Sequence, residues 1–393
     1  MVKKLFLMLL IISFFFIFSS RDVNYDDVIY FDNGRYISQN GVQSFLDRDW
    51  PFQGTTVKIT EGTHTIAPII FYSILFDAGF SRILIHFIIY LMYAGMLFPL
   101  EAIFSRMKAK HPLALAFLFL ASPAISVYAN SFMADIPAFS IMMFAVYFLT
   151  KSFDSRNSAY PVLFILAALI SVLFSYTSFL VFPLVFIAFD ECRTRRTLII
   201  ISISFLIAFA FVAMMNSFGL APSLIKSVKW FGSEKLFNHH KTLEKILALF
   251  VWTGLFAFPK IFQKTKSNIP ARLLILASAF IVSMFYFGSL HNNISKAILF
   301  ILVFSGLTCA QHLFKEKINA KRSLLTAGFG IASAVFFPMV IGRYLLPFFF
   351  LAFAVLYREE KLRSLVFFII ISAGLSSVLL TSDMLHSKSY ARL

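Results

Sequence analysis

Charge is scarce in this sequence. Only 14% of the residues are charged, 59% are hydrophobic, and the mean hydropathy is +0.82. A soluble domain could not bury that much apolar surface, so the composition excludes an ordinary soluble enzyme or binding module. Apolar runs of about 20 residues, the length of a helix that crosses a bilayer, recur along the whole chain. The sequence therefore predicts an all-α, polytopic membrane protein.

Cysteine is nearly absent. Cys192 and Cys309 are the two cysteines of the chain, too few for a disulfide framework. We place Cys192 in a cytoplasmic loop and Cys309 inside a membrane span, and we predict that both are free thiols.

A soluble region long enough for a second domain is also missing. We predict a single transmembrane domain over residues 1–393, with about 13 membrane-spanning helices and no soluble C-terminal domain. After an N-terminal segment, 5–18, the predicted spans are 83–104, 112–128, 136–150, 159–175, 177–189, 197–216, 246–259, 271–289, 296–313, 323–341, 344–357 and 364–380. The short pieces, such as 177–189 and 246–259, are candidates for tilted, broken or re-entrant helices. The proline-containing piece from Thr65 to Phe80 is short for a crossing, and we expect an interfacial helix there.

The N-terminal segment has two readings. Lys3 and Lys4 before a short apolar run fit a cleaved signal peptide. No small-residue cleavage motif follows, only the stretch from Phe18 to Arg21, which favours a retained first span. Both readings place the residues that follow on the outer side.

The lysine and arginine residues set the orientation of the spans. They give a net charge of +16, which in a soluble protein would suggest nucleic acid as a partner. When the predicted spans alternate across the membrane, every loop on one side carries more than one Lys or Arg, as the cytoplasmic loops of membrane proteins do. We therefore expect no nucleic-acid partner. We predict a multi-pass inner-membrane protein with its N-terminus cytoplasmic, its C-terminus outside and two long outer loops, 20–65 and 217–245.

This alternation gathers the chemically useful side chains on the outer face. The acidic pair Asp26-Asp27 directly follows the first apolar segment, and Asp135 lies at the next outer turn. The other candidates on this face are His64, Lys226, Lys229, Lys241, Arg343 and Tyr344. A carboxylate can take the proton of an acceptor hydroxyl as general base, and Arg or Lys can neutralise a leaving phosphate. Carboxylates and cations at one membrane face suit group transfer from a lipid-linked phosphate.

Three short motifs occur in order along the chain. Residues 25–30 read Tyr-Asp-Asp-Val-Ile-Tyr, residues 133–137 read Met-Ala-Asp-Ile-Pro after Ser122-Pro123, and residues 342–347 read Gly-Arg-Tyr-Leu-Leu-Pro. Together they resemble the GT-C class of membrane glycosyltransferases, which includes protein O-mannosyltransferases and the lipid A aminoarabinose transferase. Asp27 stands where that family usually has Glu. His64 begins a weaker match to the family's His-Pro-Pro-Leu string.

The resemblance implies a role for each matching residue. Asp26 would be the general base that activates the acceptor, Asp27 would position the acceptor or a metal, and Asp135 would orient acceptor or donor. Arg343, with Tyr344 beside it, would bind the donor phosphate, and Lys226, Lys229 or Lys241 would assist. The implied reaction is transfer of a sugar from a polyprenyl-phosphate carrier to a lipid, glycan or protein acceptor, with inversion. A divalent metal is compatible with the resemblance but not implied by it, and no other cofactor is expected.

Plain structural readings stand beside these roles. The acidic pair can be solvated loop residues, and Asp135 can cap the helix that Pro137 begins. Arg343 can reach the membrane interface as an anchor. The lysines of the 217–245 loop can contact anionic lipids, and His64 can be an ordinary loop histidine.

Two other classes of function stay open. A transporter or flippase of a lipid-linked saccharide would place ionisable residues at mid-membrane, whereas this chain keeps nearly all of them at span ends. An O-antigen ligase or polymerase would rest on Arg and His in a large late outer loop, for which 217–245 is the candidate. That class has no need of an early acidic pair.

Overall fold

The structure is a computed structural model of the whole chain, and it describes most but not all residues. The described residues are 2–17, 25–46, 50–52, 55–57, 65–132, 134–155, 157–221, 249–251, 253–255, 257, 279, 300–308, 325–330 and 346–381. For 25–29, 50–52, 55–57, Val127 and 378–381 the backbone alone is described.

The chain forms two compact units, which we describe separately. The first unit contains residues 1–106 and 127–231 and the C-terminal residues from Leu380, and the second contains 107–126 and 232–379. Both units are built from helices, as the sequence predicts; the described strands are a three-residue pair, β1 (Trp50–Phe52) and β2 (Thr55–Val57), joined antiparallel. The described part of the chain is thus all-α apart from one small hairpin.

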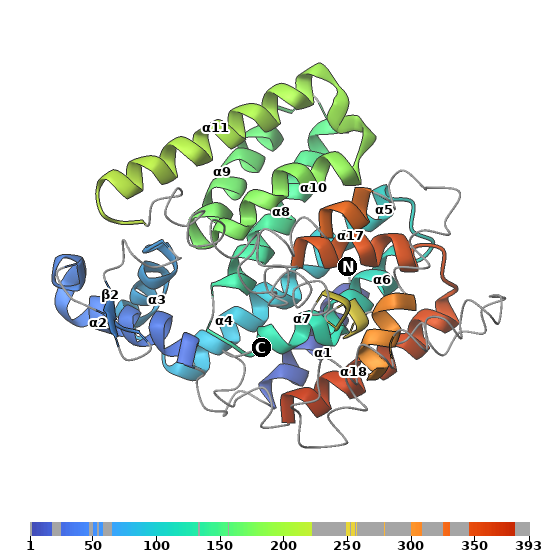
Figure 1. The fold of residues 1–393 in the computed structure, drawn as a ribbon, viewed down its shortest axis with the longest axis horizontal. Coiled ribbons are helices and arrows are strands. Elements are labelled where there is room, and N and C mark those ends of the chain that lie inside the picture. Colours follow the sequence, from blue (N-terminus) through green and yellow to red (C-terminus); the bar gives the residue numbers. More distant parts are fainter. Residues whose placement is uncertain are drawn as a thin grey trace. The chain divides into compact units, whose positions relative to one another are not determined.

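The first unit holds most of the described helices. In chain order they are α1 (Val2–Phe16), α2 (Tyr25–Leu46), α3 (Ala67–Asp77), α4 (Arg82–Gly95), α5 (Leu97–Arg106), α8 (Asp135–Asp154), α9 (Ala159–Phe174), η2 (Tyr176–Leu180), α10 (Val181–Ala188), η3 (Asp190–Arg193) and α11 (Arg195–Ser217). α9 contacts both α8 and α11, and α1 lies against α4 and α5 (Figure 1). These bounds agree closely with the predicted spans from 136 to 216.

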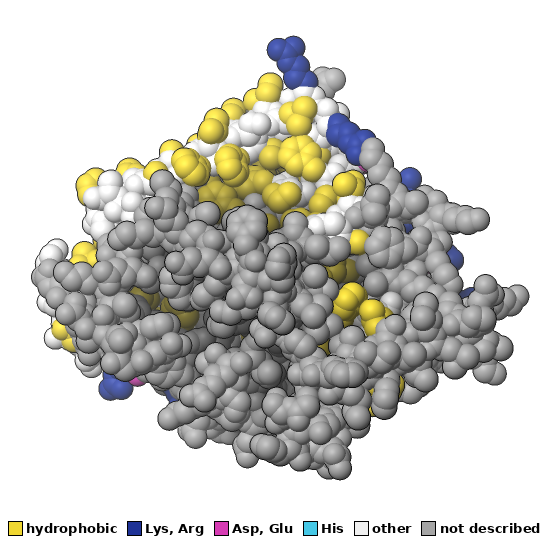
Figure 2. Space-filling view, in the orientation of Figure 1, with side chains coloured by type: hydrophobic (Ala, Val, Ile, Leu, Met, Phe, Trp, Pro, Cys, Tyr) yellow, Lys and Arg dark blue, Asp and Glu magenta, His cyan; other side chains and the backbone are white. Residues whose placement is uncertain are grey.

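Among the described residues, three helices are long and apolar enough to cross a membrane. They are the continuous pair α4–α5 (Arg82–Arg106), α8 and α11. α11 is the most lipid-like of them, because only 22% of its apolar stretch is buried inside the protein. Figure 2 shows hydrophobic side chains gathered along this helix. Its exposed hydrophobic residues include Leu198, Ile203, Leu206 and Phe209. Such an apolar surface is stable against lipid and not against water, which supports a membrane protein.

The other apolar helices that the structure describes in the first unit are shorter than a bilayer is thick. α9 has 16 residues and α3 has 11, which correspond to about 24 Å and about 16 Å of helix against a hydrocarbon core of about 30 Å. The predicted interfacial piece 65–80 is therefore a short helix, as expected from its length. The described part of the chain contains three clear spans, so the predicted number of 13 is not confirmed.

The helix ends of the first unit fall into two groups. At what we call the charged end, Arg106, Asp154 and Glu191 meet in one ion-pair network. At what we call the aromatic end, Ile66, Phe132, Leu173 and Leu220 are linked. The Ile66 N–H donates to the Leu220 carbonyl at 3.1 Å, the Thr65 hydroxyl donates to the Leu173 carbonyl, and the Tyr72 hydroxyl donates to the Phe132 carbonyl at 2.6 Å.

This grouping agrees with the predicted alternation. The residues of the charged end all belong to segments that the Lys and Arg bias assigns to the cytoplasmic side. Those of the aromatic end all belong to segments assigned to the outer side. The two faces of the first unit therefore separate in space as the charge pattern requires.

The predicted outer loop 20–65 contains a helix that the sequence analysis missed. α2 has 22 residues and bends at Gly41, whose φ of 80° is in the left-handed region that favours glycine. It packs tightly on α3: a Cβ atom on Gly34 would lie 2.5 Å from Tyr72 Cβ. The Ser38 hydroxyl also donates to Asp77 Oδ1 at 2.5 Å. The polar, glycine-containing sequence hides this helix, which depends on α3 for its packing.

Proline divides one predicted span of the chain. The predicted span 112–128 is two helices, α6 (Pro112–Ala121) and α7 (Pro123–Ala129), and α7 straddles the boundary between the units. Ser122 between them has ψ 131°, an extended value. The ring of Pro123 disfavours helical backbone at the preceding residue, so the helix must end there.

The second unit also contains α17 (Leu346–Tyr357) and α18 (Leu362–Thr381). The Phe119 ring of α6 lies against Phe353 of α17, with ring centroids 5.3 Å apart. The Ser376 hydroxyl of α18 donates to the Ala121 carbonyl at 2.9 Å. The Lys110 N–H donates to the Arg358 carbonyl at 2.8 Å, which joins two segments that were both predicted to be cytoplasmic.

Two helical stretches of this unit, near 249–257 and 300–308, pack in opposite directions. A Cβ atom on Gly254 would lie 2.9 Å from Leu302 Cα, and one on Gly306 would lie 2.9 Å from Phe250 Cα. Phe250 thus lies against Gly306, and Gly254 lies against Leu302, so the two stretches are antiparallel. The two glycines allow the backbones to touch.

This antiparallel packing differs from the directions that a simple alternation of the predicted spans gives. As straight crossings, the predicted spans 246–259 and 296–313 would run the same way, because one predicted span lies between them. The observed packing fits the other reading of the short 246–259 piece, a segment that breaks or re-enters.

Candidate functional site

The aromatic end is organised around the ring of Phe132, in the turn that precedes α8. Phe132 is 1% exposed. Its ring centroid lies 4.0 Å from that of His86 and 4.5 Å from that of Phe31, and Tyr72 approaches edge-on at 6.0 Å. Three helices, α2, α3 and α4, thus converge on one residue three positions before Asp135.

α4 presents a polar stripe to this turn. Arg82, His86 and Tyr90 are spaced by four residues, so they lie on one face of the helix. The Arg82 guanidinium lies 5.9 Å from the Phe132 ring centroid. His86 stacks on Tyr90 at 5.7 Å, and the Tyr90 hydroxyl donates to Asn130 Oδ1. The stripe therefore borders the whole 130–132 turn.

Asp135 is the first residue of α8 and is only 3% exposed. The N-cap position is Ala134, which makes no side-chain cap, so the plain reading of Asp135 as the N-cap residue does not hold. A carboxylate at this place is stabilised by the partial positive charge of the helix N-terminus. A buried acid beside an aromatic turn is a costly feature, and such features concentrate at functional sites.

The acidic pair reaches the same end of the unit. The backbone of Asp26 and Asp27 forms the start of α2. Phe31, about one helical turn later, contacts both Phe132 and Phe76. The two acidic motifs that the sequence singles out are thus linked by one aromatic contact, Phe31 to Phe132. The side chains of the pair are not among those that the structure describes.

The remaining predicted site residues lie outside the described residues. These are His64, Lys226, Lys229, Lys241, Arg343 and Tyr344. The structure brings together the start of α2 and Asp135, and it does not place the predicted phosphate-binding groups.

Sequence reasoning missed Arg82, His86 and Tyr90. The available signal was their spacing: a cation, an imidazole and a phenol recur every four residues in an otherwise apolar helix. Ionisable residues inside a membrane helix are expensive and indicate function by default. Reading α4 only as an apolar span concealed this stripe.

No metal centre is found within the described ranges, since they contain no group of three or more His, Cys, Asp or Glu side chains suited to hold an ion. Asp135 and His86 are the buried members of these residue types near the aromatic turn. Two such groups do not make the complete ligand set of a protein metal site.

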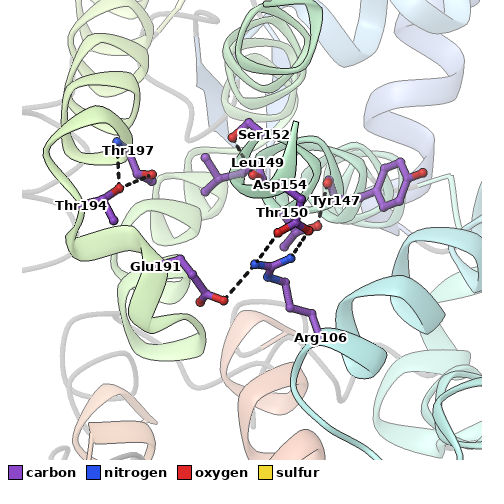
Figure 3. A network of polar contacts seen from close by, with 9 residues as sticks. All are labelled: Arg106, Tyr147, Leu149, Thr150, Ser152, Asp154, Glu191, Thr194 and Thr197. Atoms are coloured by element: carbon purple, nitrogen blue, oxygen red, sulfur yellow. Dashed lines mark hydrogen bonds and ion pairs between the residues drawn. The ribbon is translucent and has the colours of Figure 1, made fainter. Parts of the chain in front are cut away.

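The charged end has a different chemistry (Figure 3). Arg106 reaches both Asp154, as a fork, and Glu191, with an Nη2–Oε1 distance of 2.9 Å. The Asp154 side chain is 70% exposed and that of Glu191 44%, so water screens these pairs. This network joins the ends of α5, α8 and η3, and its exposed, mutually paired charges fit a structural role.

Cys192 lies beside this network as a buried free thiol, in agreement with its predicted state. Burial raises its pKa to about 12, with the neighbouring Glu191 carboxylate adding to the effect. The thiolate is the reactive form of cysteine, so this residue is chemically inert at neutral pH.

Comparison with known protein families and with curated proteins gives no match to this chain. The function must therefore be argued from the residues and their arrangement.

Proposed function

We propose that this protein is a membrane glycosyltransferase. It moves a sugar from a polyprenyl-phosphate carrier to a lipid, glycan or protein acceptor at the outer face of the inner membrane. The observation that carries the proposal is the contact of Phe31 with Phe132. It joins the start of α2, which bears Asp26 and Asp27, to the turn that leads into Asp135. Two of the three motifs that resemble the GT-C class thus lie at one end of the first unit, and residues 342–345 of the third lie outside the described residues.

The proposed reaction is a direct displacement. The Asp26 carboxylate takes the proton of the acceptor hydroxyl, and the acceptor oxygen forms a bond to the anomeric carbon. The bond from that carbon to the phosphate oxygen breaks, and polyprenyl phosphate leaves with the electron pair. Attack from the side opposite the phosphate inverts the anomeric configuration. Asp27 and Asp135 orient the reactants.

The leaving phosphate needs positive charge. In the proposal Arg343 supplies it, with Tyr344 beside it and Lys226, Lys229 or Lys241 assisting, because a guanidinium or ammonium stabilises the charge that grows on the phosphate. Membrane lipids surround the carrier's tail. A divalent metal is not required by these steps.

The proposed topology has a cytoplasmic N-terminus, about 13 spans and an outer C-terminus. The aromatic end then faces outward and the charged end faces the cytoplasm. Support comes from the separation of the two sets of helix ends, which follows the Lys and Arg bias of the sequence.

The test is transfer of labelled sugar from a polyprenyl-phosphate donor by the purified protein in lipid vesicles. Asp26→Asn keeps the size of the side chain and removes its basicity, so we expect transfer to be abolished. Asp32→Asn is the matched control, since Asp32 is an exposed acid on the same helix, and it should transfer normally. Normal transfer by Asp26→Asn would refute its role as the base. Movement of the whole lipid-linked saccharide across the bilayer, without transfer, would favour a flippase.

A further inference from the structure

His86 is a buried polar group without a visible reason to be there. Its side chain is 3% exposed, and neither ring nitrogen has a hydrogen-bond partner among the residues that the structure describes. Its neighbours are the faces of Phe132 and Tyr90, which offer no acceptor or donor in the plane of the imidazole. A buried donor or acceptor without a partner destabilises the folded state, so two such nitrogens on one side chain indicate a role other than packing.

The place of His86 limits what it can bind. It lies one turn into α4 from Arg82, against the turn that leads into Asp135. A buried imidazolium beside that guanidinium would be far more costly than a neutral ring. An uncharged imidazole carries one N–H donor and one acceptor nitrogen, which point in different directions, so each needs its own partner. A hydroxyl group both donates and accepts, so it can serve either nitrogen.

We infer that His86 binds a hydroxyl group of the donor's sugar. This inference rests on the proposed function and assigns a residue to the carbohydrate part of the carrier, as distinct from its phosphate. Phe132 now covers the imidazole, with the two ring centroids 4.0 Å apart. Sugar entry turns this ring aside, and the displaced Phe132 lies three residues from Asp135. Recognition of the correct sugar at His86 is thereby coupled to the loop that carries a catalytic carboxylate.

The experiment compares two ligands in nanodiscs: polyprenyl phosphate alone, and polyprenyl phosphate that bears glucose, galactose or mannose. For the wild type we expect one sugar-bearing carrier to bind more tightly than the bare carrier. His86→Leu should weaken binding of that sugar-bearing carrier about tenfold and leave binding of the bare carrier unchanged. His86→Gln, whose amide both donates and accepts, should recover part of the loss.

Stability separates this role from a structural one. His86→Leu removes two unsatisfied buried nitrogens, so its melting temperature should equal or exceed that of the wild type. A lower melting temperature would show that the imidazole is satisfied in the folded protein and would overturn the inference. His111→Leu, a change at a histidine of the other unit, is the control and should alter neither binding nor melting.

Two failures are distinguishable. If the wild type prefers a sugar-bearing carrier and His86→Leu keeps the same preference, the inference about His86 is wrong and the proposed function stands. If the wild type binds no carrier and transfers no sugar, the proposed function is wrong, and the assignment of His86 to a sugar falls with it.

Discussion

The two ends of the first unit differ in the exposure and the pairing of their polar side chains. At the charged end, Arg106, Asp154 and Glu191 are paired with one another and partly exposed to water. At the aromatic end, Asp135 and His86 are nearly fully buried, and the rings of Phe132 and Tyr90 lie against His86. Exposed ion pairs are inexpensive and hold helix ends together, whereas buried polar groups cost stability. This contrast supports the aromatic end as the place of the proposed chemistry.

The largest expected effect comes from exchanging one acid at each end for its amide. Asp135→Asn should reduce the rate of sugar transfer by about a hundredfold, as removal of a catalytic or orienting carboxylate typically does. Asp154→Asn, at the other end of the same helix, should transfer at close to the wild-type rate. Initial rates with labelled donor measure both. Equal losses for the two variants would remove the functional distinction between the ends.

The packing of α2 on α3 provides the next test. Gly34→Leu forces a side chain against Tyr72, so we expect a loss of about 1–3 kcal/mol in stability from overpacking. Displacement of α2 should also move the acidic pair away from Asp135 and lower transfer. Gly95→Ala is the control, because a Cβ there meets no atom within 4 Å and a helical alanine is favoured over glycine. Full transfer by Gly34→Leu would show that the position of α2 is irrelevant to the reaction.

A smaller effect is expected at the charged end. Arg106→Leu removes the fork to Asp154 and the bond to Glu191, and solvent screening limits the loss to about 1 kcal/mol. Thermal unfolding should detect it, and the difference from the wild type should shrink in high salt. Transfer should be unchanged at temperatures where the variant is folded. A selective loss of transfer would mean that this end takes part in the reaction.

The smallest effect concerns Cys192. With its pKa raised to about 12, the thiol stays protonated at pH 8, so a maleimide should not label it in the folded protein. The unfolded thiol ionises at lower pH than the folded one, so this group favours the folded state at pH 8, and its contribution is lost as the pH rises toward 12. Mass spectrometry should find labelling only after denaturation. Rapid labelling of the folded protein would show that the charged end opens.

Much of the fold follows from the sequence, because lipid demands long apolar helices. α8, α9 and α11 lie where their apolar runs predict, and their ends group as the Lys and Arg bias requires. The helix α2 could not be read in the same way, since it is polar and depends on packing against Tyr72. The end of helix α6 at Ser122 is predictable, because Pro123 disfavours helical backbone at the residue before it. The antiparallel meeting of Gly254 and Gly306 with their neighbours is a tertiary contact that local pattern does not encode.

The candidate site was partly readable. The acidic motifs follow from short strings of residues, and both start helices that reach the aromatic end. His86 escaped notice because an isolated histidine in an apolar run gives no motif. Its significance depends on burial and on missing partners, which only a three-dimensional arrangement reveals.

The central claim is that the acidic pair of α2 and Asp135 serve one site. A double-mutant cycle on transfer, with Asp27→Asn, Asp135→Asn and both together, tests it most directly. Residues that orient the same reactants should couple, so the combined loss should be clearly smaller than the product of the two single losses. Asp27→Asn combined with Asp154→Asn should show no coupling. A double variant of Asp27 and Asp135 whose loss equals that product would contradict a shared site.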